Sequence, residues 1–533
     1  LISGLIDHAA RVHGRTEIVS REFDRTLHRT NYAKVERRAR RLAKALRRLG
    51  IGEGDRVASL AWNTHRHLEV YYGVSGMGAV LHTVNPRLFP EQLIYMINHA
   101  SDRILFADGT FVPLLEKLLP HLPLVERIVL LLPEAAMPPS DPEFLSYEAL
   151  LDAEDEGYAW PEFDERRAAM LCYTSGTTGN PKGALYSHRS TVLHAMASST
   201  ADMLGLTAGD SVCPVVPMFH ACAWGTAYSA PLTGARLVMP GQHLDGESLC
   251  SLFREERVTC SAGVPTLWLG ALDHAGRTGN GFGPLKRVLI GGSAAPPSMI
   301  DAFASYGIEA RQGWGMTEMS PLGTVAALKH HHADAPEEDR RAAIESQGRP
   351  PYLVEMKLVG AEGQVLPHDG TSIGEVWVRG AWIISGYFGD EAATRDAFDR
   401  DGWFRTGDVG TIDEDGYLRL TDRAKDVIKS GGEWISSIDL ENAALAHPDV
   451  GEAAVIGVPH PKWSERPLLV VVLQPGRPLD KEAILAFLAE RVARWWLPDD
   501  IVAMAEIPHS ATGKISKAKL RDDFRDYRRP SVA

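Results

Sequence analysis

The chain has 533 residues, which is too long for one hydrophobic core and predicts several packed units. Hydrophobic residues make up 44% and charged residues 23%, as in ordinary globular proteins, so the composition excludes a mainly disordered chain. The net charge of −13 argues against a protein that coats nucleic acid. The five cysteines lie in apolar runs without C-x-x-C spacing, so we expect reduced, buried thiols in a cytoplasmic protein.

Apolar stretches in this chain are short. The longest, such as residues 468–473, have the length of a strand and fall far below the ~18 residues of a membrane span. No charged segment followed by a long apolar run stands near Leu1, so we expect no secretory signal, and the sequence does not decide what precedes Leu1.

The first predicted element is an amphipathic helix over residues 31–49, ended by Gly50. Its apolar side chains recur at alternating spacings of four and three: Val35, Ala39, Leu42, Leu46 and Leu49. Arg and Lys occupy the opposite face. Such a face can bind membranes or nucleic acid, but a solvated surface is the simpler interpretation.

Short β-rich runs then alternate with helical stretches, which predicts βαβ units and largely parallel sheets. The runs are residues 56–60, 103–106, 127–132, 211–216, 236–239 and 287–290. The apolar run at 168–172 predicts a buried strand end. The polar stretch 329–347 contains His330, His331 and His332. A metal-binding tract is the alternative here, and a surface loop or helix is the favoured interpretation.

Between residues 374 and 420 the pattern changes to short alternating strands with Gly and Asp turns, which predicts a small antiparallel, barrel-like part. The fold class is therefore α/β, with a large N-terminal domain of βαβ parallel sheets over 1–424, whose barrel-like part covers about 350–420. A small α+β C-terminal domain follows over 425–533.

The segment YTSGTTGNPKG at 173–183 carries five hydroxyl side chains, three glycines and one lysine. Its glycines let backbone N–H groups turn toward an anion, and its hydroxyls and Lys182 add donors and charge. A flexible Ser/Thr/Gly linker is the alternative. Because Gly183 rather than Ser or Thr follows Lys182, the segment is not the common NTPase loop. The sequence predicts a phosphate-binding loop.

Together with motifs further along, this loop resembles the signature of the adenylate-forming family, which includes acyl-CoA synthetases, luciferases and peptide-synthetase adenylation domains. The further motifs, in the order of the family, are GWGMTE at 313–318, TGD at 406–408, DRAKDVIKSGGEWIS at 422–436 and TGKI at 512–515. Among its branches, the chain most resembles bacterial medium- and long-chain fatty-acyl-CoA synthetases, through PMFHACAW at 217–224, GGSAAPPS at 291–298 and SGGEWISS at 430–437.

The resemblance implies a nucleotide site in which the GGS segment borders adenine, Trp314 covers the other face of the ring, and Asp408 accepts the ribose hydroxyls. Core packing is the alternative for Trp314 and an ordinary turn for Asp408. The resemblance further implies that Thr317 meets the α-phosphate and that Glu318 holds Mg²⁺. The residues so assigned to ATP or AMP are Thr174, Ser175, Gly176, Thr177, Thr178, Gly179, Lys182, Gly291, Gly292, Ser293, Gly313, Trp314, Gly315, Met316, Thr317, Asp408 and Arg423.

The acyl side is inferred from PMFHACAW. By resemblance, His220 lines the acyl pocket and Trp224 gates it; if a helix has begun by His220, both side chains project from one face. A core Trp is the alternative for Trp224. Trp314 and Met316, where many relatives have Tyr and Leu, would narrow the pocket and favour short or medium acids, including 3-methylmercaptopropionate.

The C-terminal motifs imply a small domain that rotates between two half-reactions. By resemblance, Lys514 is the cation that stabilises adenylation, with a solvated basic patch as the alternative. The hinge and the loop of the thioester-forming state are assigned to Lys425, Asp426, Lys429, Gly431, Gly432, Glu433 and Trp434.

The resemblance therefore implies an ATP-dependent acyl-CoA synthetase that uses Mg²⁺ and coenzyme A and acts on a carboxylic acid, with no nucleic-acid partner and with homodimer formation left open. A luciferase-type or carrier-loading enzyme shares the first half-reaction. A nucleotide-binding regulator without catalysis is the alternative from another class.

Overall fold

The computed structural model describes residues 1–139, 144–174, 180–360, 362–423, 426, 428–430, 433–509, 515–525 and 527. These fall into two compact units, Leu1–Glu355 with Arg379–Asp399, and Met356–Val378 with Arg400–Ala533. Most of the predicted antiparallel part, residues 374–420, thus groups with the C-terminal part of the chain. The domain boundary at 424/425 stays a prediction.

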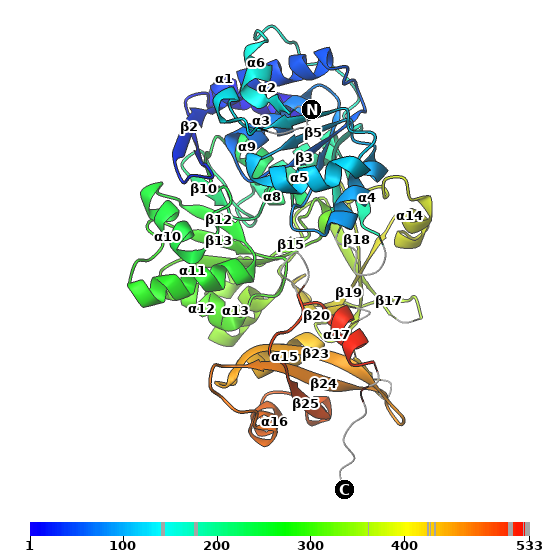
Figure 1. Ribbon diagram of the computed structural model, residues 1–533. Helices are drawn as coiled ribbons and strands as arrows, with labels where there is room; N and C mark the ends of the chain where they lie inside the picture. Colours follow the sequence, from blue (N-terminus) through cyan, green and yellow to red (C-terminus); the bar gives the residue numbers. More distant parts are fainter. Residues whose placement is uncertain are drawn as a thin grey trace. The chain divides into compact units, whose positions relative to one another are not determined.

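The first unit contains two sheets (Figure 1). The seven-stranded sheet has the order β7-β6-β5-β3-β4-β8-β9 and is parallel except for the antiparallel pair β8/β9. Its strands are β3 (Arg56–Leu60), β4 (Val80–Thr83), β5 (Ile104–Ala107), β6 (Arg127–Leu130), β7 (Leu145–Ser146), β8 (Ala168–Thr174) and β9 (Lys182–Ser187).

The eight-stranded sheet has the order β15-β14-β13-β12-β10-β11-β1-β2 and is antiparallel only at its two edges. Its strands are β1 (Glu17–Arg21), β2 (Leu27–Asn31), β10 (Ser211–Pro214), β11 (Arg236–Met239), β12 (Cys260–Gly263), β13 (Arg287–Ile290), β14 (Glu309–Trp314) and β15 (Thr324–Val325). The six predicted strand runs all appear, and three of them have the predicted bounds. The prediction of βαβ units and parallel sheets is confirmed.

Helices connect and cover these strands. In Figure 1, α10, α11 and α12 lie together beside β10, β12 and β13. The helices of the unit are α1 (Ile2–Val12), α2 (Tyr32–Arg48), α3 (His65–Gly76), α4 (Pro90–Ala100), α5 (Val112–Leu118), α6 (Tyr147–Asp152), α7 (His188–Ser198), α8 (Ala221–Trp224), α9 (Thr226–Thr233), α10 (Gly246–Glu255), α11 (Pro265–Thr278), α12 (Pro297–Ser305), α13 (Glu337–Glu345) and α14 (Glu391–Ala397), with 3-10 turns η1 (Gly109–Phe111), η2 (Leu119–His121), η3 (Glu134–Ala136), η4 (Thr317–Met319) and η5 (His330–Ala333).

The predicted amphipathic helix is α2. Its N-cap is Asn31, whose side chain accepts a hydrogen bond from the N–H of Lys34. Its apolar face packs on α3 so closely that a Cβ on Gly73 would lie 2.8 Å from Leu42. The two helices can approach this far because position 73 has no side chain.

The second unit contains two further sheets. The antiparallel sheet has the open order β17-β16-β18-β19-β20, so the predicted strand direction is confirmed. Its strands are β16 (Val354–Val359), β17 (Val365–Leu366), β18 (Gly374–Gly380), β19 (Phe404–Ile412) and β20 (Leu418–Arg423).

The C-terminal sheet is built on the long pair β23/β24, and its described helices cover an apolar core. Its elements are β21 (Ile428–Ser430), β22 (Glu433–Ile435), α15 (Ser437–Leu445), β23 (Val450–His460), β24 (Ser464–Leu473), α16 (Lys481–Ala489), η6 (Arg494–Trp496), β25 (Asp500–Ala503) and α17 (Lys517–Asp523). This mixture confirms the predicted α+β C-terminal part.

The five cysteines are free and buried, as predicted. Every helix among the described residues is too short or too polar to cross a bilayer.

Candidate active site

Two of the predicted nucleotide motifs meet at the carboxyl ends of β13 and β14. Ile290 and Gln312 are paired in the parallel register, so Gly291 and Gly313 follow side by side. A Cβ on Gly291 would lie 3.1 Å from the carbonyl oxygen of Gly313, and Gly292 has φ +84°. Carboxyl ends of neighbouring parallel strands are where α/β sheets bind ligands. Gly291 and Gly292 therefore present backbone without side chains at this edge of the sheet, and we call them the glycine platform.

The turn after β14 needs glycine at position 315. A Cβ there would overlap the carbonyl oxygen of Pro321 and lie 2.8 Å from its carbonyl carbon. Trp314 is buried, and its indole would approach a Cβ on Gly323 to 2.8 Å. The predicted contact of Trp314 with adenine stays a prediction.

Thr317 and Glu318 open the 3-10 turn η4, which three hydrogen bonds fix from outside. The Tyr186 hydroxyl donates to the Thr317 carbonyl oxygen at 2.6 Å, and the Ile384 N–H donates to the Glu318 carbonyl oxygen at 2.9 Å. The Tyr387 hydroxyl donates to Oε1 of Glu318 at 2.8 Å. Glu318 is only 7% exposed, and the bond from Tyr387 helps to orient its buried carboxylate.

The phosphate-loop segment begins and ends on the antiparallel pair β8/β9, where Thr174 is paired with Lys182. This confirms the predicted strand before the loop. Lys182 is exposed, and its Nζ lies 5.1 Å from the ring centroid of Tyr387. The predicted loop residues Ser175, Gly176, Thr177, Thr178 and Gly179 lie outside the described residues.

The acyl segment differs from the prediction. His220 has an extended backbone, and α8 after it is a left-handed turn in which Ala221, Cys222, Ala223 and Trp224 have φ between +40° and +59°. The expectation that His220 and Trp224 share one face of an ordinary helix is therefore wrong. Each non-glycine residue in this conformation costs roughly 1–2 kcal/mol, and such strain concentrates at functional sites.

The left-handed turn carries the Trp224 indole to the glycine platform. A Cβ on Gly291 would lie 3.1 Å from that indole, and one on Gly292 3.8 Å. Gly225 ends the turn at φ +80°, where a Cβ would lie 2.6 Å from Nδ1 of His194. Burial lowers the pKa of His194 to about 3, so this imidazole is neutral near pH 7.

The second unit holds the other predicted nucleotide residues. Asp408 on β19 is buried, and it is paired with Arg423 on β20 in the antiparallel register. Asp426 forms an ion pair with Arg521. Lys429 is paired with Trp434, and Glu433 with Ser430, in the hairpin β21/β22. Lys425, Gly431, Gly432 and Lys514 lie outside the described residues.

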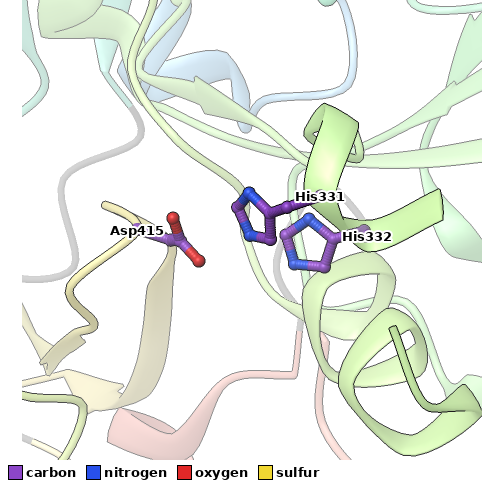
Figure 2. Close-up of side chains that lie close together, drawn as sticks. All are labelled: His331, His332 and Asp415. Atoms are coloured by element: carbon purple, nitrogen blue, oxygen red, sulfur yellow. The ribbon is translucent and has the colours of Figure 1, made fainter. Parts of the chain in front are cut away.

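The three adjacent histidines lie in η5, followed by α13, which agrees with the favoured interpretation of this polar stretch as a surface loop or helix. Figure 2 shows the imidazoles of His331 and His332, whose centroids are 4.3 Å apart. Asp415, also labelled there, belongs to the second unit. Two histidines from one turn are too few ligands to define a metal site.

Two tyrosines in the site were missed by sequence reasoning. Tyr186 follows Lys182 by four residues on one strand, so strand alternation places both on the same face and could have indicated it. Tyr387 reaches the site from the segment between β18 and α14, about 200 residues after the phosphate loop. No local pattern predicts that contact.

Residues 6–388 match the family described as AMP-binding enzyme, and residues 439–514 match the AMP-binding enzyme C-terminal domain. The chain belongs to the AMP-binding enzyme family. It is 52% identical to a 3-methylmercaptopropionyl-CoA ligase of Ruegeria lacuscaerulensis, over 99% of this chain and 97% of that protein. It is 49% identical to a medium-chain-fatty-acid–CoA ligase of Ectopseudomonas oleovorans, over 99% and 96%.

Among solved structures, the chain is similar to the anthranilate CoA ligase AuaEII in complex with anthranoyl-AMP. It has a TM-score of 0.84 and 26% identity, and the match covers 97% of this chain and 96% of that one. These relatives confirm the predicted adenylate-forming family, the α/β fold and the class of AMP-forming acid–thiol ligases.

Proposed function

We propose that this AMP-binding enzyme is an acyl-CoA synthetase whose nucleotide site is built from the residues described above. The observation that carries the proposal is a juxtaposition in the first unit. Lys182 and Glu318 both contact Tyr387, and the Gly291–Gly292 platform ends the strand beside β14, from which the Glu318 turn continues. One unit thus supplies a cation, a buried carboxylate and a stretch of backbone without side chains.

In the first half-reaction, a carboxylate oxygen of the acid attacks the α-phosphorus of ATP, and the bond from that phosphorus to the pyrophosphate oxygen breaks. Lys182 would attract the phosphates, and the Thr317 hydroxyl would donate to an α-phosphate oxygen. The Glu318 carboxylate and nearby hydroxyls are hard oxygen donors of the kind that suits Mg²⁺. When bound there, Mg²⁺ would neutralise charge on the phosphates.

In the second half-reaction, the thiol of coenzyme A loses its proton and its sulfur attacks the acyl-AMP carbonyl carbon. The bond from that carbon to the AMP oxygen then breaks, giving the thioester and AMP. We assign Asp408 and Arg423 to the ribose, Lys514 to the first half-reaction, and the β21/β22 hairpin to the second. For Lys514 and the β21/β22 hairpin to act in turn at one site, the C-terminal part would have to rotate about Lys425 between the two half-reactions.

The acid is proposed to be a short or medium-chain carboxylic acid. The Trp224 indole lies against the glycine platform, where it would restrict a pocket that extends past Gly291. A thioether acid is the second candidate, because relatives at 52% identity are named 3-methylmercaptopropionyl-CoA ligases. Homodimer formation stays a prediction from the resemblance.

The test is a panel of acids from C3 to C18, with 3-methylmercaptopropionate included, incubated with ATP, Mg²⁺ and coenzyme A. Mass spectrometry of the thioesters should give the highest kcat/KM for acids of eight carbons or fewer. Pocket discrimination of about 1–3 kcal/mol per methylene corresponds to about 10–200-fold, so kcat/KM should fall steeply once the acid is longer than the pocket. A maximum at C16 or C18 would refute the assignment of chain length.

A further inference from the structure

Tyr387 belongs to none of the nucleotide motifs named above. It lies between β18 and α14, in the part of the chain that joins the first unit. Its hydroxyl donates to Oε1 of Glu318 at 2.8 Å, and Nζ of Lys182 lies 5.1 Å from the centroid of its ring. One side chain therefore contacts both charged groups that the proposed function assigns to ATP.

The backbone around Tyr387 is fixed independently of its side chain. Tyr387 forms an antiparallel bridge with Ala184, and the Phe388 N–H donates to the Gly183 carbonyl oxygen at 2.8 Å. The Tyr387 N–H donates to Oγ1 of Thr394 at 2.9 Å. None of these bonds uses a side-chain atom of Tyr387, so a change of that side chain should leave the segment in place.

The Tyr387 hydroxyl is the donor in its hydrogen bond to Glu318, and the carboxylate oxygen Oε1 is the acceptor. Glu318 is only 7% exposed, so this bond acts on a buried carboxylate and holds one of its oxygens in place. A hydrogen bond of this kind to a metal-binding carboxylate fixes its orientation.

We propose that Tyr387 is a positioning residue that orients Glu318 for Mg²⁺ through its hydroxyl and holds Lys182 toward the phosphates through its ring. The proposal rests on the proposed function, since it uses the nucleotide site assigned there. Its two parts are separable, because Phe keeps the ring and removes only the hydroxyl, whereas Leu removes both.

The experiment is isothermal titration calorimetry of ATP into the full chain, at increasing MgCl₂ and in EDTA. In Tyr387→Phe, the MgCl₂ concentration that gives half-maximal tightening of ATP binding should rise about tenfold, the lower range for such supporting contacts. Binding in EDTA should match wild type. Tyr387→Leu should show the same rise and, in addition, a several-fold weaker ATP affinity in EDTA, because Lys182 loses its aromatic contact.

The matched control is Tyr306→Phe. This variant also removes a tyrosine hydroxyl, but from an exposed residue whose ring packs against Phe282. It should leave both measurements at wild-type values, and circular dichroism should give the three variants the wild-type fold. An unchanged MgCl₂ requirement in Tyr387→Phe would overturn the assignment for Glu318. Equal EDTA affinities in Tyr387→Phe and Tyr387→Leu would overturn the assignment for Lys182.

The outcome is distinguishable from failure of the proposed function. Acid-dependent ATP–pyrophosphate exchange by the wild type tests that function separately. If the wild type binds ATP with Mg²⁺ but never exchanges pyrophosphate, the function is refuted while the calorimetric comparison still decides the role of Tyr387. If the wild type binds no ATP, both are refuted.

Discussion

Gly315→Ala tests whether the turn that carries Thr317 and Glu318 must keep its shape for catalysis. An added Cβ would overlap the Pro321 carbonyl oxygen and lie 2.8 Å from its carbonyl carbon. Carbon atoms in contact normally lie about 3.5–4.0 Å apart, so the carbon contact alone requires the turn to move by about 1 Å, and the overlap with the oxygen requires more. The obstacle is backbone, which cannot rotate away as a flexible side chain would.

A displacement of about 1 Å in a catalytic arrangement can cost about 10²-fold in rate, so kcat for acid-dependent ATP–pyrophosphate exchange should fall by about that factor. The matched control is Gly276→Ala in α11, where an added Cβ meets nothing within 4 Å. That variant should keep the wild-type rate. A wild-type exchange rate in Gly315→Ala would refute the idea that this turn positions the reacting groups.

Three further predictions concern other parts of the chain. Arg38→Met should lower the free energy of unfolding by about 3–5 kcal/mol in urea titrations, because Glu69, which is 0% exposed, loses its cationic partner at 2.8 Å. The double variant Arg38→Met with Glu69→Gln should recover much of that loss, because no unpaired charge is then buried. A double variant as unstable as Arg38→Met alone would contradict the explanation. The buried His194 stays neutral in the folded chain down to about pH 3 while the unfolded chain takes up a proton below about 6.5, so stability should fall as pH decreases between these values, by up to about 1.4 kcal/mol per pH unit from this residue. His194→Gln should lose that part of the slope, and an identical slope would refute the assignment. Lys514→Ala should slow acyl-AMP formation by about 10²–10³ while leaving thioester formation from supplied acyl-AMP largely intact; equal loss of both would contradict the proposed division of labour.

The sequence predicted most of the parallel sheets because their strands are short apolar runs between helices, and this pattern is local. It also placed Gly291 and Gly292 directly after such a run, where the structure has the glycine platform that follows β13. It failed at α8, because nothing in the letters HACAW distinguishes a left-handed turn from a right-handed helix. Only the surrounding packing, with Gly225 held against His194, makes that turn understandable.

The contacts of Tyr387 could not be predicted for a different reason. Tyr387 lies about 70 residues after Glu318 and about 200 residues after Lys182 in the sequence. No periodic pattern in the residues between them indicates that these side chains meet. The family resemblance and the loop composition suggested Glu318 and Lys182 as charged groups of the site, whereas the Tyr387 side chain that contacts both became visible only in three dimensions.

The most direct test of the central claim, that an acyl-AMP is formed, follows the carboxylate oxygen. Acid labelled with ¹⁸O in both carboxylate oxygens is incubated with the enzyme, ATP, MgCl₂ and coenzyme A, and the AMP is analysed by mass spectrometry. Attack on the α-phosphorus followed by cleavage of the acyl carbon–oxygen bond predicts one ¹⁸O atom in each AMP formed. Unlabelled AMP, or release of ADP with labelled phosphate, would contradict the account.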